Sequence, residues 1–376
     1  MTLEEIRSGL PPPSSPEFCT QPNPFFEPWI LDNARRHLLK PHDRFLSVES
    51  GGRIALPSAT DRRIPRWLPT VARVGADDHC FDATPLTQDV HPADLKSVFS
   101  LLAEGGVDIL RWRRLPLDTE FMAAFSEFLA GAGLACESTK VYRRPLLVRD
   151  DSDPDAFLSR NLSKKRLKDI QRRRQRLGEL GKVEFRVHEG EHDAGEWCRN
   201  FIELEASGWK GPSGTGTAIG CSANESAFFE AVASEGAAAG RLIVHSLLLD
   251  GKPVAMTVNF RSGTWVWAYK VAYNESLTNV SPGVLLEVEG SRAFLNDTTI
   301  ACVDSCTTSE QGVMARLWPG RRPMGEFLIA VHPRANRMVR ASGSLWRRYH
   351  ALKLSLKEKM RDPANILKLP GQLANR

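Results

Sequence analysis

The sequence lacks most signatures of secreted, disulfide-bonded or membrane-spanning proteins. Its seven cysteines are an odd number, spread from Cys19 to Cys306 without a CxxC pair, so we expect neither a disulfide framework nor a structural zinc site. No stretch approaches the roughly 18 unbroken apolar residues of a membrane span. The first residues are acidic and then proline-rich, and they show neither the basic nor the apolar region of a secretory signal. These absences favour a cytoplasmic protein.

What is present is the balance of a soluble globular chain: 376 residues, 42% apolar and 25% charged. The proline- and serine-rich start predicts a flexible leader over residues 1–20. An Asp-rich loop at Asp150–Asp155 predicts a boundary between an N-terminal domain, 21–150, and a C-terminal domain, 151–335. A basic helix and tail, 336–376, would follow.

The net charge of +5 is unevenly distributed. Two segments, Arg160–Arg176 and Arg334–Arg361, each carry nine Lys or Arg and one acid, so the rest of the chain is acidic. Solvated helix faces would explain either segment. The second segment also holds Trp346 and Tyr349, and arginines with aromatic rings can bind a cyclic dinucleotide or lie on an anionic membrane surface at the inner membrane face. No pattern of a DNA-binding motif appears, so we expect no specific DNA binding.

Hydrophobic patterns and turn signals predict an α+β protein with a mixed, mostly antiparallel sheet flanked by helices. The second half is the more regular. Its expected elements, in order, are a helix at 163–180, a strand at 183–187, helices at 193–207 and 224–237, strands at 241–249, 254–261 and 264–272, a helix at 281–295, strands at 299–304 and 326–331, and a helix at 345–360. The first half has a shorter version of the same mixture.

The most informative stretch is residues 264–290, where a strand leads through a loop to a helix that begins at Ser281-Pro282-Gly283. Ser281 suits the N-cap, and Pro282 suits the first helical position because its missing N–H is not needed there. Gly283 leaves the backbone accessible. A helix N-terminus with free amides binds anions such as a pyrophosphate, although an ordinary helix start has the same sequence features.

Four stretches of the second half resemble the GNAT acyltransferase superfamily, specifically its CelD-like (cellulose-biosynthesis-type) branch, which is related to the Fem aminoacyltransferases. They are NLSKKRLKDIQRRRQRLGELG, Gly208-Trp209-Lys210, LLLDGKPVAMTVNF, and YKVAYNESLTNVSPGVLLEVEG followed by a strand that ends in Asp304. The resemblance covers roughly residues 155–330. It implies a GNAT fold, with two GNAT-like units in tandem.

The resemblance further implies acetyl-CoA or another acyl-CoA as co-substrate, without a metal. The pantetheine arm would lie along a splayed strand near Ala268–Val271, with Val271 among the binding residues. The pyrophosphate would bind the amides around Ser281, Pro282, Gly283 and Val284.

Acyl transfer from a thioester to an amine needs a base for the amine's proton, donors for the oxyanion and a proton for the departing thiolate. Asp304 is the first candidate for the base or for a substrate-orienting group; a loop-capping carboxylate is the alternative. Tyr269 and Tyr273 are candidate proton donors, or packing residues. Many relatives carry a Gly-rich turn and a Tyr-Lys pair after the strand that ends here at Asp304, and this sequence does not. The thiolate's proton donor therefore stays unassigned.

Four further residues are expected at the acceptor. Trp209 and Lys210 match the family's Trp-Lys pair and would line the acceptor cleft, where an aromatic face suits a sugar and the ammonium suits a phosphate or sugar acid. Lys270 also matches the pattern. Arg316 could hold an anionic acceptor. A packing Trp and solvated cations are the alternatives.

Two other features point away from chemistry. The string HEGEH, residues 188–192, fits the zinc-protease motif, but that motif needs a continuous helix, and here it follows a strand and contains a glycine. Cys306 has no histidine near it in sequence, so a buried small apolar residue is a better interpretation than a nucleophile.

The preferred hypothesis is a cytoplasmic, acyl-CoA-dependent N-acyltransferase acting on an amino sugar of an exopolysaccharide or of its lipid-linked precursor. A second hypothesis is a Fem-like aminoacyltransferase that takes aminoacyl-tRNA. A third is a weakly catalytic GNAT scaffold that regulates polysaccharide production through an anionic ligand at its basic tail, with or without peripheral attachment to the membrane.

Overall fold

The computed structural model describes residues 23–40, 43–50, 54–61, 68–75, 78–87, 90–150 and 152–345. The predicted leader, 1–20, and most of the predicted basic helix and tail, 336–376, lie outside these residues. Both remain predictions.

The strands of the described residues form one 12-stranded sheet in the order β1-β2-β3-β5-β12-β6-β11-β10-β9-β8-β7, with β4 paired to β2. The N-terminal half contributes β1 (Asp43–Ser50), β2 (Ile54–Asp61), β3 (Val71–Val74), β4 (Leu86–Thr87), β5 (Ile109–Pro116) and β6 (Cys136–Val148). The C-terminal half contributes β7 (Val183–Glu189), β8 (Leu242–Leu249), β9 (Lys252–Ser262), β10 (Trp265–Tyr273), β11 (Cys302–Asp304) and β12 (Gly320–Ala330).

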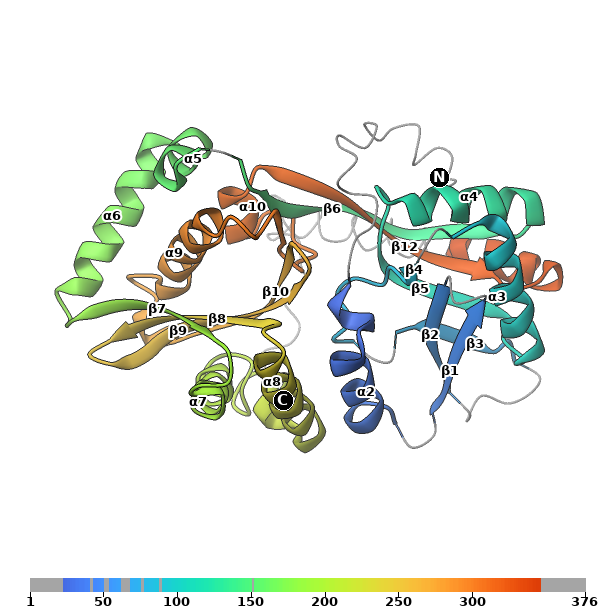
Figure 1. Ribbon diagram of the computed structural model, residues 1–376, viewed down its shortest axis with the longest axis horizontal. Helices are drawn as coiled ribbons and strands as arrows, with labels where there is room; N and C mark the ends of the chain where they lie inside the picture. The colour runs from blue at the N-terminus through green and yellow to red at the C-terminus, as the bar shows by residue number, and fades with distance from the viewer. Residues whose placement is uncertain are drawn as a thin grey trace, which may run out of the picture.

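Two long strands at the centre join the halves. β12 comes from the C-terminal part of the chain, yet it pairs antiparallel with β5 on one side and with β6 on the other. β6 in turn pairs with β11. Figure 1 shows β6 and β12 running across the top of the view from one half to the other. The predicted boundary near residue 150 falls just after β6, but a cut there would not separate two independent sheets.

Helices cover both faces of the sheet (Figure 1). In the C-terminal half α7 (Ala194–Ala206) and α8 (Ala223–Ala238) lie on one face, while α9 (Pro282–Asn296) packs on the other beside α5 (Pro154–Asn161) and α6 (Lys164–Gly178). The short α10 (Val313–Leu317) contacts α9. The N-terminal half has α2 (Pro28–His37), α3 (Pro92–Glu104) and α4 (Glu120–Ala132).

Local signals explain many of these elements. The β8–β9 hairpin turns at Asp250-Gly251, both with positive φ, as the Asp-Gly pair predicts. The predicted basic helix is α6, which Ser163 caps by accepting a hydrogen bond from the Arg166 amide at 3.3 Å. On α8, Gly236 allows α2 to approach, since a Cβ there would lie 2.7 Å from the Trp29 ring.

The opening NPFF segment ties the halves together. Phe25 is buried, and its ring lies 6.0 Å from those of Phe81 and Phe260 and 6.5 Å from that of Trp267, measured between centroids. One continuous core cluster therefore spans the N-terminal helices and the C-terminal strands. A second cluster fills the opposite face of the C-terminal sheet, under α6 and α9.

Candidate functional site

An opening forms where two parallel strands diverge. β10 pairs with β11 over only three residues, from Trp265↔Cys302 to Trp267↔Asp304, while β10 continues to Tyr273. Just beyond that pairing, the register of β10 against β9 shifts between Ala268 and Lys270. Such a bulge bends the strand and strengthens its local twist. This geometry agrees with the splayed strand expected near Ala268–Val271.

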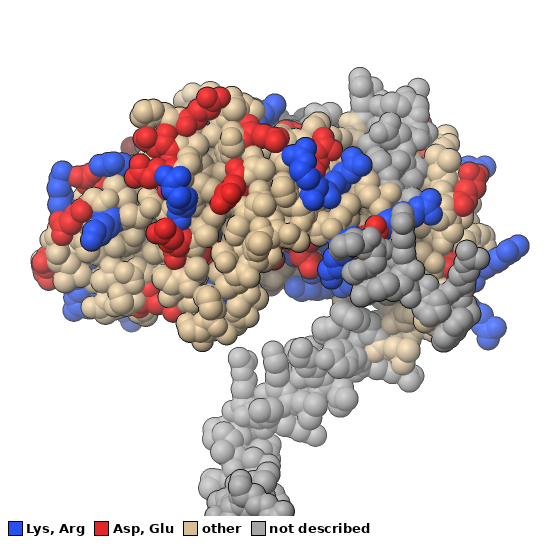
Figure 2. Space-filling view, turned by 90° about the horizontal axis from the view of Figure 1, so that it is seen from below, with Lys and Arg blue, Asp and Glu red and all other residues tan. Residues whose placement is uncertain are grey.

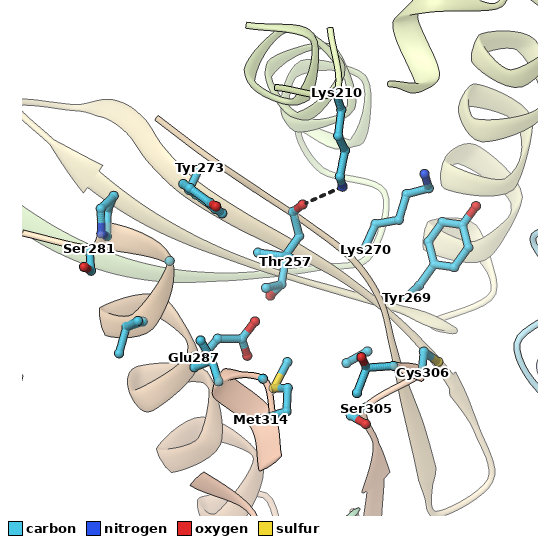
Figure 3. A pocket seen from close by; sticks show the side chains of 18 of the residues that line it. Lys210, Thr257, Tyr269, Lys270, Tyr273, Ser281, Glu287, Ser305, Cys306 and Met314 are labelled. Carbon is cyan, nitrogen blue, oxygen red and sulfur yellow. Dashed lines mark hydrogen bonds between the residues drawn. The ribbon is translucent and has the colours of Figure 1, made fainter. Parts of the chain in front are cut away.

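A cavity of about 520 Å³ fills the opening (Figure 3). Nine of the twelve predicted site residues line it: Lys210, Tyr269, Lys270, Val271, Tyr273, Ser281, Pro282, Gly283 and Val284. Trp209, Asp304 and Arg316 do not. The structure therefore brings nine of the predicted residues to one cavity and leaves three outside it.

The N-terminus of α9 forms one end of the cavity. Ser281 is at the N-cap position with a left-handed backbone (φ 49°), but its side chain does not cap the helix as predicted. Instead Ser281 Oγ donates to the Thr278 carbonyl at 3.0 Å. Within the described residues the Gly283 amide has no hydrogen-bond acceptor. A Cβ at Gly283 would lie 3.1 Å from the Tyr273 ring, so glycine keeps this backbone accessible.

A cation from the basic helix stands beside this turn. Arg173 of α6 donates to Ser281 Oγ, and its Nε is 2.8 Å from Asp169 on the same helix. The sequence predicted the helix but not this contact, because α6 and α9 are more than 100 residues apart. The contact places a guanidinium next to an uncapped helix N-terminus, an arrangement suited to an anion.

A buried carboxyl, Glu287, faces the cavity from α9 (Figure 3). It is only 8% exposed, and its carboxyl has no hydrogen-bond or ion-pair partner among the described residues. Burial raises its pKa to about 8. Sequence reasoning missed this residue, although its spacing was a signal. Residues four apart in a helix lie on the same face, so Glu287 is one turn further along α9 than Gly283.

Two lysines reach the cavity from the opposite side of β10 and share one carboxylate. Glu205 of α7 is buried, and its Oε1 lies 2.9 Å from Lys210 Nζ and 3.6 Å from Lys270 Nζ. Burial lowers the pKa of Lys270, although Glu205 opposes the shift. Glu205 was not predicted as a site residue. It gives both ammonium groups a fixed position at the cavity wall.

The two predicted tyrosines differ. Tyr269 is buried, its ring stacks on Phe260 with centroids 4.4 Å apart, and its hydroxyl lies 2.5 Å from His79 Nδ1. The Nε2 atom of His79 is 3.7 Å from Glu225 of α8, whose pKa is lowered chiefly by the hydrogen bond with that histidine. Tyr273 is 38% exposed, at the end of the cavity near Gly283.

The expectation that Asp304 acts as the base is not met, because its carboxylate is fully buried and occupied. Oδ1 is 3.1 Å from Arg144 Nη1 and accepts the Cys306 amide at 2.8 Å; Oδ2 is 2.9 Å from Arg322 Nη1. Arg322 also binds Asp82 of the N-terminal half at 2.9 Å. The structure thus gives Asp304 a structural role at the junction of the two halves.

Two acceptor predictions also need correction. The Trp209 side chain is 53% exposed and lies outside the cavity, while its amide donates to Glu275 Oε1 at 3.0 Å. Arg316 is exposed on α10 and does not line the cavity either. The residues of α10 that do line it are Val313 and Met314, because this short helix turns its apolar face inward.

Ser305 and Cys306, which directly follow β11, complete the wall of the cavity. Ser305 is 5% exposed, and its Oγ is buried with no hydrogen-bond partner among the described residues. Cys306 has a left-handed backbone, and burial raises the pKa of its thiol well above the usual range. A thiol held protonated is a poor nucleophile, in agreement with the sequence interpretation.

The HEGEH string is not on a helix. β7 ends at Glu189, α7 begins at Ala194, and the two histidines are held apart: His188 Nε2 lies 3.2 Å from Ser246 Oγ, and His192 is exposed. Among the residues that the structure describes, no group of three or more His, Cys, Asp or Glu is placed to hold a metal ion.

The described part of the chain also contains no helix with the length and apolarity required to cross a bilayer. On the face shown in Figure 2, acidic and basic side chains alternate over the C-terminal half. This part of the surface therefore presents no broad area of one charge.

The comparisons with known proteins agree with this geometry. Residues 164–333 match a family model described as an acetyltransferase (GNAT) domain. The chain therefore contains a GNAT acetyltransferase domain, which makes it an acyltransferase of a class that uses acyl-CoA. The predicted fold class is confirmed: a GNAT fold with a mixed, mostly antiparallel sheet flanked by helices.

Two solved structures extend the likeness in fold beyond that domain. FemX superposes with a TM-score of 0.54 and 10% identity, covering 87% of this chain and 96% of its own. A conserved protein of unknown function from Bacteroides thetaiotaomicron superposes with a TM-score of 0.52 and 10% identity, covering 88% and 97%. At this identity the likeness is one of fold alone. No curated protein matches the sequence.

Proposed function

We propose that the chain is an acyl-CoA-dependent N-acyltransferase of the CelD-like branch that transfers an acetyl group to an amino sugar of an exopolysaccharide or of its lipid-linked precursor. The observation that carries the proposal is the cavity between the diverging strands β10 and β11, with the uncapped N-terminus of α9 at one end. A long donor with a diphosphate and a thioester has the shape that such a cavity accepts.

Two groups support the binding of the acyl-CoA diphosphate at this end of the cavity. The Gly283 amide and the Arg173 guanidinium would bind the diphosphate, since both are donors beside the positive end of the α9 dipole. The pantetheine arm would follow β10 along Ala268–Val271. Its thioester would then lie near Ser305, whose buried hydroxyl lacks a partner among the described residues and could donate to the oxyanion.

Glu287 replaces Asp304 as the proposed base. As the amine nitrogen bonds to the acyl carbon, its proton passes to the Glu287 carboxylate; as the carbon–sulfur bond breaks, the same carboxyl returns that proton to the thiolate. A carboxyl with a pKa of about 8 suits both transfers near neutral pH. This role also supplies the proton donor that the sequence left unassigned.

The acceptor would enter from the opposite side of β10. Lys210 and Lys270, both held by Glu205, would line the acceptor's path there. Tyr269 and Tyr273 would shape this part of the cavity rather than donate a proton.

Calorimetry with acetyl-CoA and CoA tests the proposal. We expect both to bind the full chain, and Gly283→Leu to abolish binding because the side chain would fill the turn. Gly131→Leu is the matched control, since a Cβ at this exposed helical glycine meets nothing within 4 Å. Absence of binding to the wild type, or equal binding by both variants, would refute the proposal. Turnover is then measured on a panel of amino sugars.

The basic segment 336–376 belongs to a separate part of the proposal. Its Arg and aromatic residues would bind an anionic membrane surface at the cytoplasmic face or a cyclic dinucleotide. Cosedimentation with anionic vesicles, and calorimetry with cyclic dinucleotides, would be compared between the full chain and a chain that ends at Pro333. Equal binding by both chains would eliminate this role.

A further inference from the structure

A second cavity, of about 350 Å³, lies in the N-terminal half, with one wall from α8. Most of its charged lining residues are cationic. The lining includes Lys40, Arg73, Arg111, Arg113 and Arg114 with Asp43, Asp78 and Glu225. The positive charges outnumber the negative ones around a cavity that is open to solvent, which makes an anion the favoured occupant.

Three of these arginines share one face of two neighbouring strands. Arg73 of β3 is directly opposite Arg111 of β5 in the parallel register, and Arg113 lies two residues along β5 on the same face. Like charges placed opposite each other on a sheet destabilise it. Partial burial and the nearby Arg113 lower the pKa of Arg111, while the Glu326 and Asp78 carboxylates oppose the shift.

The acids of the cavity neutralise this group only in part. Arg73 is 2.7 Å from Asp43, and Arg113 is 2.7 Å from Asp78. Arg111 lines the same cavity, but its guanidinium has no hydrogen-bond or ion-pair partner among the described residues. Because Arg111 is exposed, its guanidinium is accessible to a ligand that enters the cavity from solvent.

This cavity lies beside the first cavity, the one between β10 and β11, and a hydrogen-bonded pair of side chains stands between them. His79 lines the second cavity, Tyr269 lines the first, and their Nδ1 and Oη atoms are 2.5 Å apart. Lys270 lines the first cavity on the side of β10 from which we propose that the acceptor enters. A molecule that spans this wall would present an amine to the first cavity and an anionic group to the second.

We propose that the second cavity binds a carboxylate or phosphate group of the acceptor, with Arg111 as the main contact. The inference rests on the proposed acyltransferase function and narrows its substrate class to amino sugars that carry a negative charge.

The test compares the affinities of three amino sugars for the full chain by calorimetry: glucosamine 6-phosphate, glucosaminuronic acid and neutral glucosamine. We expect one or both anionic sugars to bind about tenfold more tightly than glucosamine, with the gap narrowing as salt rises. The sugar that shows the preference identifies phosphate or carboxylate as the group recognised.

Substitutions assign the preference to this cavity. Arg111→Gln should remove it, Arg111→Lys should retain part of it, and Lys96→Gln, which changes an exposed lysine of α3 that does not line the cavity, should leave it unchanged. Acetyl-CoA affinity should be equal in all four proteins. The inference is overturned if the wild type shows no preference for the anionic sugars or if Arg111→Gln keeps it. Failure of acetyl-CoA to bind the wild type would instead refute the proposed function, and the preference would still be measured independently.

Discussion

Two buried carboxyls, less than 20 residues apart in sequence, show how hydrogen-bond and ion-pair partners distinguish a structural carboxyl from one that is available for catalysis. Asp304, at the junction of the two halves, is bonded to two guanidinium groups and a backbone amide. Glu287, on the cavity wall, is almost as buried but has no partner among the described residues. A neutralised carboxylate holds its surroundings in place. A carboxyl without a partner is kept protonated by burial, so it can exchange a proton with a ligand.

The largest effect is expected at the neutralised carboxylate. Asp304→Ala leaves Arg144 without its ion-pair partner in a fully buried position, so the free energy of unfolding should fall by about 3–5 kcal/mol in urea denaturation. Acetyl-CoA affinity should change only through unfolding. A variant of normal stability that has lost turnover would instead return Asp304 to the catalytic role.

The second substitution, Glu287→Gln, should raise the stability of the fold at high pH, whereas Asp304→Ala should lower it. The folded-state pKa of Glu287, about 8, lies above the value near 4.5 in an unfolded chain. The stability due to its protonation is complete below about pH 4.5 and is lost as pH rises towards 8, at up to roughly 1.4 kcal/mol for each pH unit. Glu287→Gln, which cannot ionise, should therefore be more stable than the wild type at pH 8 and equal to it below pH 4.5, as thermal melts would show.

The same substitution should reduce turnover. Loss of a general base costs about 10²–10³ in kcat, and the wild-type rate should rise with pH through about 8 as Glu287 ionises, a dependence that Glu287→Gln should lack. Glu289→Gln is the control on the same helix, because Glu289 pairs with Arg174 and Arg292 and does not line the cavity. Equal rates and pH profiles for wild type and Glu287→Gln would exclude this carboxyl as the base.

The contrast between the two carboxyls also explains what could be read from the sequence. The turn at Ser281-Pro282-Gly283 was predictable because its signals are adjacent residues. The ion pairs of Asp304 were not, because Arg144 and Arg322 come from strands that only the sheet brings together. Nor was the role of Ser281 predictable: its backbone is left-handed, and its hydroxyl is bonded to the Thr278 carbonyl and to Arg173, 108 residues away, instead of capping the helix. Local chemistry was therefore predictable, whereas the partners that decide a residue's role depend on the fold.

The smallest expected effect is on acetyl-CoA affinity, and it tests whether the contacts of a cation also decide its role. Arg172 and Arg173 are neighbours on α6 and both bind Asp169, at 2.6 and 2.8 Å. Only Arg173 reaches Ser281, so Arg173→Gln should weaken acetyl-CoA binding about tenfold through loss of one charge-assisted contact, whereas Arg172→Gln should have no effect. Calorimetry at two salt concentrations measures both variants, and the deficit of Arg173→Gln should shrink at high salt. Equal losses would mean that the whole charge of the helix, rather than the guanidinium beside the turn, attracts the donor.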